Sequence, residues 1–75
     1  MFKLPFKPGD DMWYIDDATL EIKCEKSGIA GIAFMADGEV KMVNWDGLVF
    51  SIGQEDVFPN YEMALARQKE LLAKK

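Results

Sequence analysis

Turn-forming residues divide this chain into short apolar segments, and that spacing limits its possible folds more than any other feature. Gly, Asp, Asn and Pro recur at the breaks, and the longest apolar segment between them covers residues 29–36. Short segments separated by turn signals are typical of antiparallel strands in a barrel or sandwich. Because 75 residues are too few for two full sheets, the sequence predicts a mainly β fold, a small bent barrel of five to six strands. A single sheet backed by a helix is the alternative.

Five segments have the composition of strands, and they are expected at residues 12–15, 19–24, 29–36, 40–43 and 48–52. The second of these alternates between apolar and polar side chains, which predicts one solvated face. Gly31 inside the third predicts a bulge or a sharp bend. Asp37-Gly38 predicts a hairpin turn of type I′, because that turn requires positive φ at both central residues.

The N-terminal segment, residues 1–9, has two interpretations. Its apolar residues alternate as in a strand, whereas Pro5 and Pro8 restrict it to an edge strand or an arm. The segment could complete its own barrel. It could also pair with the edge strand of a neighbouring copy and so build a homo-oligomer.

The C-terminal segment predicts an amphipathic helix. Asn60 is a good N-cap, and apolar residues recur at helical spacing after it. Residues 54–59 are expected to form a helical turn that places Val57 and Phe58 in the core. The expected single domain therefore consists of an arm or edge strand (1–9), the β-barrel (10–58) and the helix (60–74), with the helix packed on its own barrel.

Composition excludes several kinds of chemistry. The chain is 49% hydrophobic, with five Phe, two Trp and two Tyr, which favours a folded domain over a disordered one. Cys24 is the single cysteine and histidine is absent, so no disulfide, metal site or cofactor is expected. No apolar run approaches the ~18 residues that a membrane span requires. These features predict a cytoplasmic protein.

The sequence also does not predict an enzyme. Serine and cysteine nucleophiles usually need a histidine base, and the chain has none. The pairs Asp10-Asp11 and Asp16-Asp17 bracket the first expected strand, and paired carboxylates could serve a glycosidase or bind calcium. Asp at strand ends is also typical of turns, because its side chain accepts hydrogen bonds from nearby backbone N–H groups. We expect this second role for both pairs.

The charge distribution favours a protein partner over a nucleic acid. The net charge is −4, and residues 1–58 hold eleven acidic and five basic side chains, whereas residues 59–75 hold two and four. Nucleic-acid binding draws much of its affinity from lysine and arginine at the phosphates, so an acidic barrel is poorly suited to it. The uneven charge is compatible with a mixed-charge protein partner or with head-to-tail contact between copies.

Aromatic residues give the best candidate for a binding surface. Trp13 and Tyr14 are adjacent in a strand and point to opposite faces, so at most one of them belongs to the core. The predicted partner-binding surface combines aromatic residues with neighbouring acids: Trp13, Tyr14, Asp16, Asp17, Trp45 and Phe50. Alternatively, the C-terminal helix or the N-terminal arm covers the second aromatic residue.

The stretch Gly-Asp-Asp-Met-Trp-Tyr-Ile at residues 9–15 resembles the opening of many small barrel proteins with an SH3-like fold. With Glu-Asp-Val-Phe-Pro at residues 55–59 and the helix after it, the chain is similar to small proteins encoded in bacteriophages and prophages of Gram-positive bacteria. Residues 60–63 depart from that pattern, in which acidic residues followed by alanine often begin the helix. The resemblance implies an SH3-like barrel and, for a phage protein, the host-cell cytoplasm. It implies no particular activity.

The sequence therefore predicts a non-enzymatic protein-interaction or self-assembly module. Its aromatic and acidic surface would bind a protein partner or another copy of the chain. The alternative is a small barrel associated with nucleic acid, in which bases stack on the aromatic residues. The net charge of −4 argues against that alternative.

Overall fold

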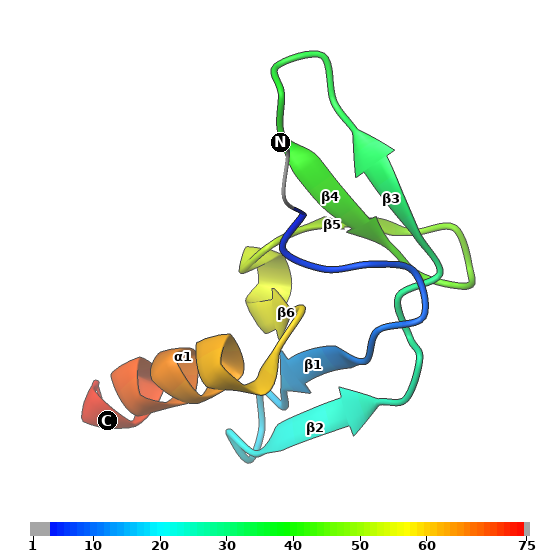
Figure 1. Cartoon of the computed structure of the whole chain (residues 1–75). Coiled ribbons are helices and arrows are strands. Elements are labelled where there is room, and N and C mark those ends of the chain that lie inside the picture. The colour runs from blue at the N-terminus through cyan, green and yellow to red at the C-terminus, as the bar shows by residue number, and fades with distance from the viewer. Residues whose placement is uncertain (1–3, 75) are drawn as a thin grey trace.

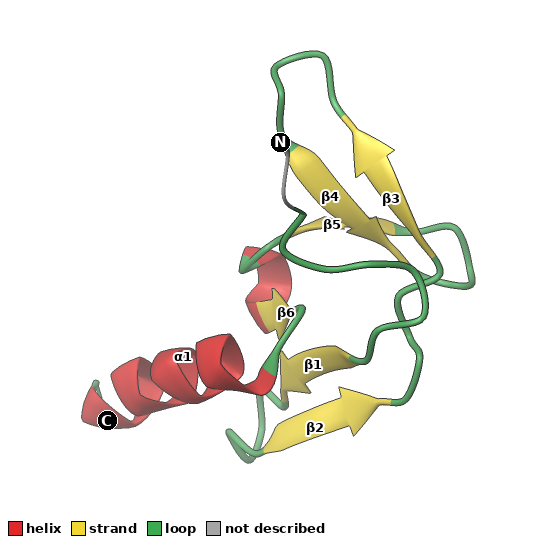
Figure 2. Ribbon diagram, in the orientation of Figure 1, coloured by secondary structure: helices red, strands yellow, loops and turns green. Residues whose placement is uncertain are grey.

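The computed structural model describes residues 4–74, which form six strands and a C-terminal helix (Figure 1). The elements are β1 (Met12–Ile15), β2 (Ile22–Glu25), β3 (Gly31–Phe34), β4 (Val40–Val43), β5 (Val49–Ser51), the 3₁₀ turn η1 (Gln54–Asp56), β6 (Val57–Phe58) and α1 (Tyr61–Ala73). The strands form two antiparallel three-stranded sheets in the orders β2-β1-β6 and β3-β4-β5 (Figure 2). No helix in this described part is long and apolar enough to cross a membrane.

The antiparallel strands and the C-terminal helix are confirmed, but the strands do not close into the expected single barrel. The two sheets share no strand, and the longest strands of the described chain have four residues. A small barrel needs strands that continue around the bend between its two halves. The strand expected at residues 29–36 is shorter in the structure, because the backbone of Ile29 bonds to Gly9 and Asp10 instead of to a sheet. The shortened strand does not continue around the bend. The result is an open pair of small sheets.

Val57 and Phe58 enter the core as expected, but they do so in a strand and not in a helical turn. They form β6, which pairs with β1 so that Val57 lies opposite Tyr14 and Phe58 lies opposite Trp13. The helical turn is confined to η1, and Val57 is already extended, with φ −112° and ψ 133°. This pairing attaches η1 to the first sheet.

Alternation along β1 and β6 divides their side chains between two hydrophobic cores. The core between the two sheets comprises Phe6, Met12, Ile29, Met42 and Val57. The core beneath α1 comprises Ile15, Leu20, Phe58 and Ala64. Each of the two strands therefore contributes one residue to each core.

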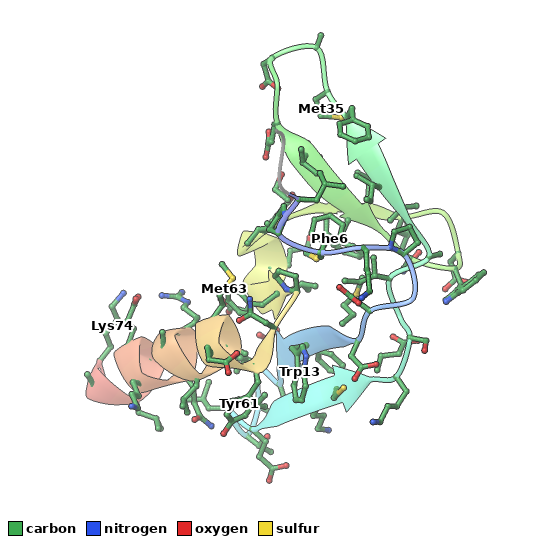
Figure 3. The ribbon with its side chains drawn as sticks, viewed as in Figure 1. Phe6, Trp13, Met35, Tyr61, Met63 and Lys74 are labelled. Atoms are coloured by element: carbon green, nitrogen blue, oxygen red, sulfur yellow. The ribbon has the colours of Figure 1, made fainter. Side chains whose placement is uncertain are left out.

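The N-terminal arm packs on its own domain over residues 4–9. Phe6 is only 4% exposed, and the Gly9 N–H donates to the carbonyl of Ile29 at 2.8 Å. Figure 3 places Phe6 between the two sheets. Residues 4–9 form no strand, because Pro5 and Pro8 have no N–H to donate. Phe2, one of the alternating apolar residues of the expected arm, lies outside the described residues.

Both hairpins of the second sheet use a loop that ends in a glycine with positive φ. Between β3 and β4, Gly38 (φ 90°) donates its N–H to Met35, and Met35 donates to Glu39. The prediction of a type I′ turn is wrong, because φ is positive at Gly38 but not at Asp37. The bonds are those of a type I turn followed by a G1 bulge, and Gly47 (φ 83°) repeats the pattern between β4 and β5.

The helix α1 packs on the first sheet, as expected. Asn60 is its N-cap, with Oδ1 accepting the Met63 N–H at 2.9 Å. Ala64 is fully buried in the second core, and Gln68 Nε2 donates to the carbonyl of Leu20 at 2.8 Å. These contacts hold the helix beside the turn between β1 and β2.

Candidate functional site

An open groove lies between the β1–β2 turn and η1, with a volume of about 750 Å³. We call it the acidic groove, and its lining residues are Tyr14, Ile15, Asp16, Asp17, Ala18, Glu55, Asp56 and Val57. Tyr14, which is 37% exposed, is the aromatic residue among them. The pairing of β6 with β1 brings η1 beside the β1–β2 turn, and the groove forms between the two.

Asp16 forms one wall of the groove and is held by the turn after β1. Its Oδ1 accepts the N–H groups of Ala18 (2.8 Å) and Thr19 (3.2 Å), and its Oδ2 lies 3.1 Å from Lys23 Nζ. The Lys23 ammonium, followed by these two N–H groups, holds the pKa of Asp16 below its ordinary value. Asp16 in turn raises the pKa of Lys23. The carboxylate therefore stays charged in weak acid.

The opposite wall is fixed by α1. Arg67 Nε lies 2.8 Å from Asp56 Oδ1, and Arg67 Nη1 lies 3.1 Å from Glu70 Oε2. Asp56, and then Glu70, raise the pKa of Arg67. Glu55 and Asp56 have positive φ angles of 54° and 57°. That conformation costs about 1–2 kcal/mol per residue with a side chain, so the contact with α1 helps to hold a strained turn.

Two carboxylates of the acidic groove, Asp17 and Glu55, form no ion pair with any residue of the described chain. Both side chains are exposed. Asp16 and Asp56 are matched by one base each, so the negative charge that remains in the groove belongs to Asp17 and Glu55. Among the described residues, the groove therefore offers two carboxylates without an ion pair and one aromatic ring to the solvent.

The structure brings together only part of the predicted binding surface. Tyr14, Asp16 and Asp17 line the acidic groove. Trp13 points to the other face of β1, toward α1, where its ring meets Tyr61 edge-on at a centroid distance of 5.4 Å (Figure 3). The C-terminal helix therefore covers one of the two adjacent aromatic residues.

The other two predicted residues, Trp45 and Phe50, belong to the second sheet. Trp45 is 73% exposed in the β4–β5 turn, where its Nε1 donates to the carbonyl of Ser27 at 2.8 Å. Phe50 is half-buried and packs against the core between the sheets. Neither residue lines the acidic groove.

Sequence reasoning did not assign Glu55 and Asp56 to the binding surface. They are far from Asp16 along the chain, and only the pairing of β6 with β1 brings them close. The available local signal was the acidic pair directly before Val57 and Phe58. That signal marks a possible strand start, but it does not identify the strand with which those residues pair.

The chemistry of the groove is that of charge and aromatic contact. Within residues 4–74, no group of three or more His, Cys, Asp or Glu side chains could hold a metal ion.

Cys24 is exposed on β2, and desolvation followed by the charge of Asp11 raises the pKa of its thiol. The thiol is therefore a weak nucleophile at neutral pH.

Comparison with protein-family models, with curated proteins and with solved structures finds no match for this chain. The resemblance to phage-encoded proteins therefore stays a prediction.

Proposed function

We propose that this protein is a non-enzymatic interaction module that binds a basic segment of a partner protein in the acidic groove. The observation that carries the proposal is that Asp17 and Glu55, both exposed and without an ion pair in the described chain, share the groove with the ring of Tyr14. A lysine or arginine side chain can lie against a tyrosine ring while its charge meets a carboxylate. This recognition requires no reacting group.

The ion pairs within the groove support a binding role. Lys23 and Arg67 hold Asp16 and Asp56 in place, one on each wall. A site that is already ordered loses less conformational entropy when a partner binds. The carboxylates of Asp17 and Glu55 take no part in these two ion pairs, so they can contact the partner.

The features predicted from the sequence fit this proposal. A phage origin would make a protein of the host cytoplasm the partner. A nucleic acid is disfavoured, because the net charge of −4 and the carboxylates of the groove repel phosphates.

Selection of short random peptides on the immobilised full chain tests the proposal. We expect enrichment of peptides in which lysine or arginine stands beside an aliphatic or aromatic residue. Their affinity, measured by fluorescence anisotropy, should fall as salt is added, because the charges involved are exposed. Enrichment of peptides without basic residues would contradict the proposal.

Paired substitutions locate the binding site. Asp17→Asn with Glu55→Gln should weaken the selected peptides about three- to tenfold, because two exposed charge contacts are lost. Asp37→Asn with Glu39→Gln removes the same charges from the β3–β4 hairpin and should leave the affinity unchanged. An equal loss in both double variants would mean that the groove is not the site. Capture of nucleic acid alone from a lysate, abolished by nuclease, would favour the alternative function.

A further inference from the structure

One edge of β3 has no partner strand among residues 4–74. β3 pairs with β4 on one side, and on the other side it ends the second sheet. In Figure 1 the β3–β4 hairpin projects away from the first sheet and from α1. Such an edge presents N–H and C=O groups with which another strand can pair.

The register identifies the backbone groups that face this edge. The Met35 N–H donates to Glu39 at 2.9 Å, and along an antiparallel pair the hydrogen-bonded positions alternate with positions that are not bonded. By this alternation the N–H and C=O groups of Ala33 point toward β4, whereas those of Ile32 and Phe34 point outward. The edge therefore offers two donors and two acceptors at alternate residues.

The sequence of β3 does not protect this edge. Residues 29–36 contain no charged residue and no proline, which are the usual means of preventing edge pairing. At the far end of the strand, Phe34 is 66% exposed, and Met35, which is labelled in Figure 3, is 41% exposed. A second strand would cover both the polar backbone groups and the apolar side chains.

We propose that two copies of this protein dimerise by antiparallel pairing of their β3 edges, which joins the two β3-β4-β5 sheets into one six-stranded sheet. Since the backbone N–H and C=O groups of Ile32 and Phe34 point outward, the two-fold axis that relates the two copies passes beside Ala33. Ile32 of each copy exchanges hydrogen bonds with Phe34 of the other, and the two Ala33 residues lie directly opposite each other. Each exposed Phe34 ring is then covered by Ile32 of the second copy.

A second copy fits this edge because the strand is complementary to itself. Its outward groups are symmetric about Ala33, and a small side chain suits the close approach of a non-hydrogen-bonded pair. The chain carries a net charge of −4, but the uncharged edge brings no like charges together on the paired strands. The strand has only four residues, so it makes a small interface, and interfaces below ~1,200 Å² are typical of weak or transient complexes. The dimer is therefore concentration-dependent.

The proposed dimer interface is separate from the acidic groove. The acidic groove lies on the first sheet and β3 lies in the second. Variants of the groove that lose peptide binding should still dimerise, and variants of β3 that stay monomeric should still bind peptides. Failure of one proposal is thus distinguishable from failure of the other.

Sedimentation velocity of the full chain from micromolar to millimolar concentration tests the dimer. Ala33→Lys places two lysines across the axis beside Lys41 of each copy, and should raise the dimer Kd about tenfold or more. Val49→Lys is the matched control, since it adds the same charge to the same outer face on β5, where Val49 is 46% exposed. The control should leave the Kd unchanged.

The opposite charge at the same position provides a rescue. A mixture of Ala33→Lys with Ala33→Glu should form a mixed dimer that is tighter than the dimer of Ala33→Lys alone, because a Lys–Glu pair then spans the axis. Native mass spectrometry with one isotopically labelled variant measures the mixed species. Far-UV circular dichroism establishes that both variants are folded.

Amide hydrogen exchange gives a residue-specific readout. The N–H groups of Ile32 and Phe34 should exchange more slowly at millimolar than at micromolar concentration. A chain that stays monomeric at millimolar concentration overturns the proposal. A dimer whose Kd is unchanged by Ala33→Lys, or is raised equally by Val49→Lys, also overturns it. The same holds if the mixture forms no mixed dimer, or if the exchange rates of these two amides do not depend on protein concentration.

Discussion

At the scale of single residues, Gly28 shows how closely the backbone approaches the core between the sheets. A Cβ at this position would lie 3.0 Å from the Cβ of Met12 and 3.1 Å from the Cβ of Glu25. Both atoms are attached directly to backbone, so neither can move away without shifting its strand. The requirement for glycine is therefore steric.

Gly28→Ala should lower the free energy of unfolding by about 1–3 kcal/mol, because the added methyl group overpacks this contact. Gly31→Ala is the matched control, since the nearest atom to its added Cβ would be the Val43 Cβ at 4.0 Å. The control should be neutral or slightly stabilising, because glycine weakens a strand interior. Urea denaturation followed by circular dichroism measures both variants. Equal costs would show that the contact at Gly28 relaxes easily.

At the scale of elements, the β1–β2 turn depends on one carboxylate. Asp16 accepts two backbone N–H groups within the turn and pairs with Lys23 of β2. The turn also holds Leu20 at a positive φ of 62°, with the Leu20 N–H donating to the Asp16 carbonyl at 2.7 Å. The Gln68 side chain of α1 then bonds to the carbonyl of Leu20. The turn is thus a junction between two strands and the helix.

The stabilisation by Asp16 should depend on pH. Its pKa is lower in the folded protein than the ordinary value of 3.8, so the stabilisation is complete above that value and is lost as pH falls through the lower folded pKa. Asp16→Asn should therefore lower the melting temperature at neutral pH, and the difference from wild type should shrink below about pH 4. Lys23→Gln removes the same ion pair and should behave alike. Melting curves across a pH series measure this, and a difference of full size at pH 2 would contradict it.

At the scale of the whole molecule, two small cores are joined through β1 and β6. Met12 and Val57 contribute to the core between the sheets, whereas Ile15 and Phe58 contribute to the core beneath α1. In a chain of 75 residues, neither core is large enough to stabilise a sheet alone. The two sheets should therefore unfold together.

The two tryptophans report this cooperativity separately, because Trp13 is in β1 and Trp45 is in the turn that joins β4 and β5. In Trp45→Phe the fluorescence follows the first sheet, and in Trp13→Phe it follows the second. Within each variant, the urea transition by fluorescence should coincide with the transition by far-UV circular dichroism. A fluorescence midpoint below the circular dichroism midpoint in Trp13→Phe would show that the second sheet unfolds independently.

The sequence by itself determined the local features of this protein. Five of the six strands overlap the predicted segments, and Asn60 caps the C-terminal helix as expected. These features follow from residues near one another in the chain, such as a glycine with positive φ in a turn or an N-cap three residues before its donor. The apolar pair Val57 and Phe58 was also predicted to be buried, because hydrophobicity is a property of the residues themselves.

Only the tertiary structure decided which elements meet. It paired β6 with β1, kept the two sheets from closing into a barrel, and left the Phe34 edge of the second sheet open. It also assembled the acidic groove from Asp17 and Glu55, while it placed Trp13 and Trp45 elsewhere. Strand pairing depends on contacts between residues distant in the chain, and several partners satisfy the same alternation of apolar side chains. Local pattern therefore specifies where the strands lie, and the competition among their possible pairings specifies the surface that a partner meets.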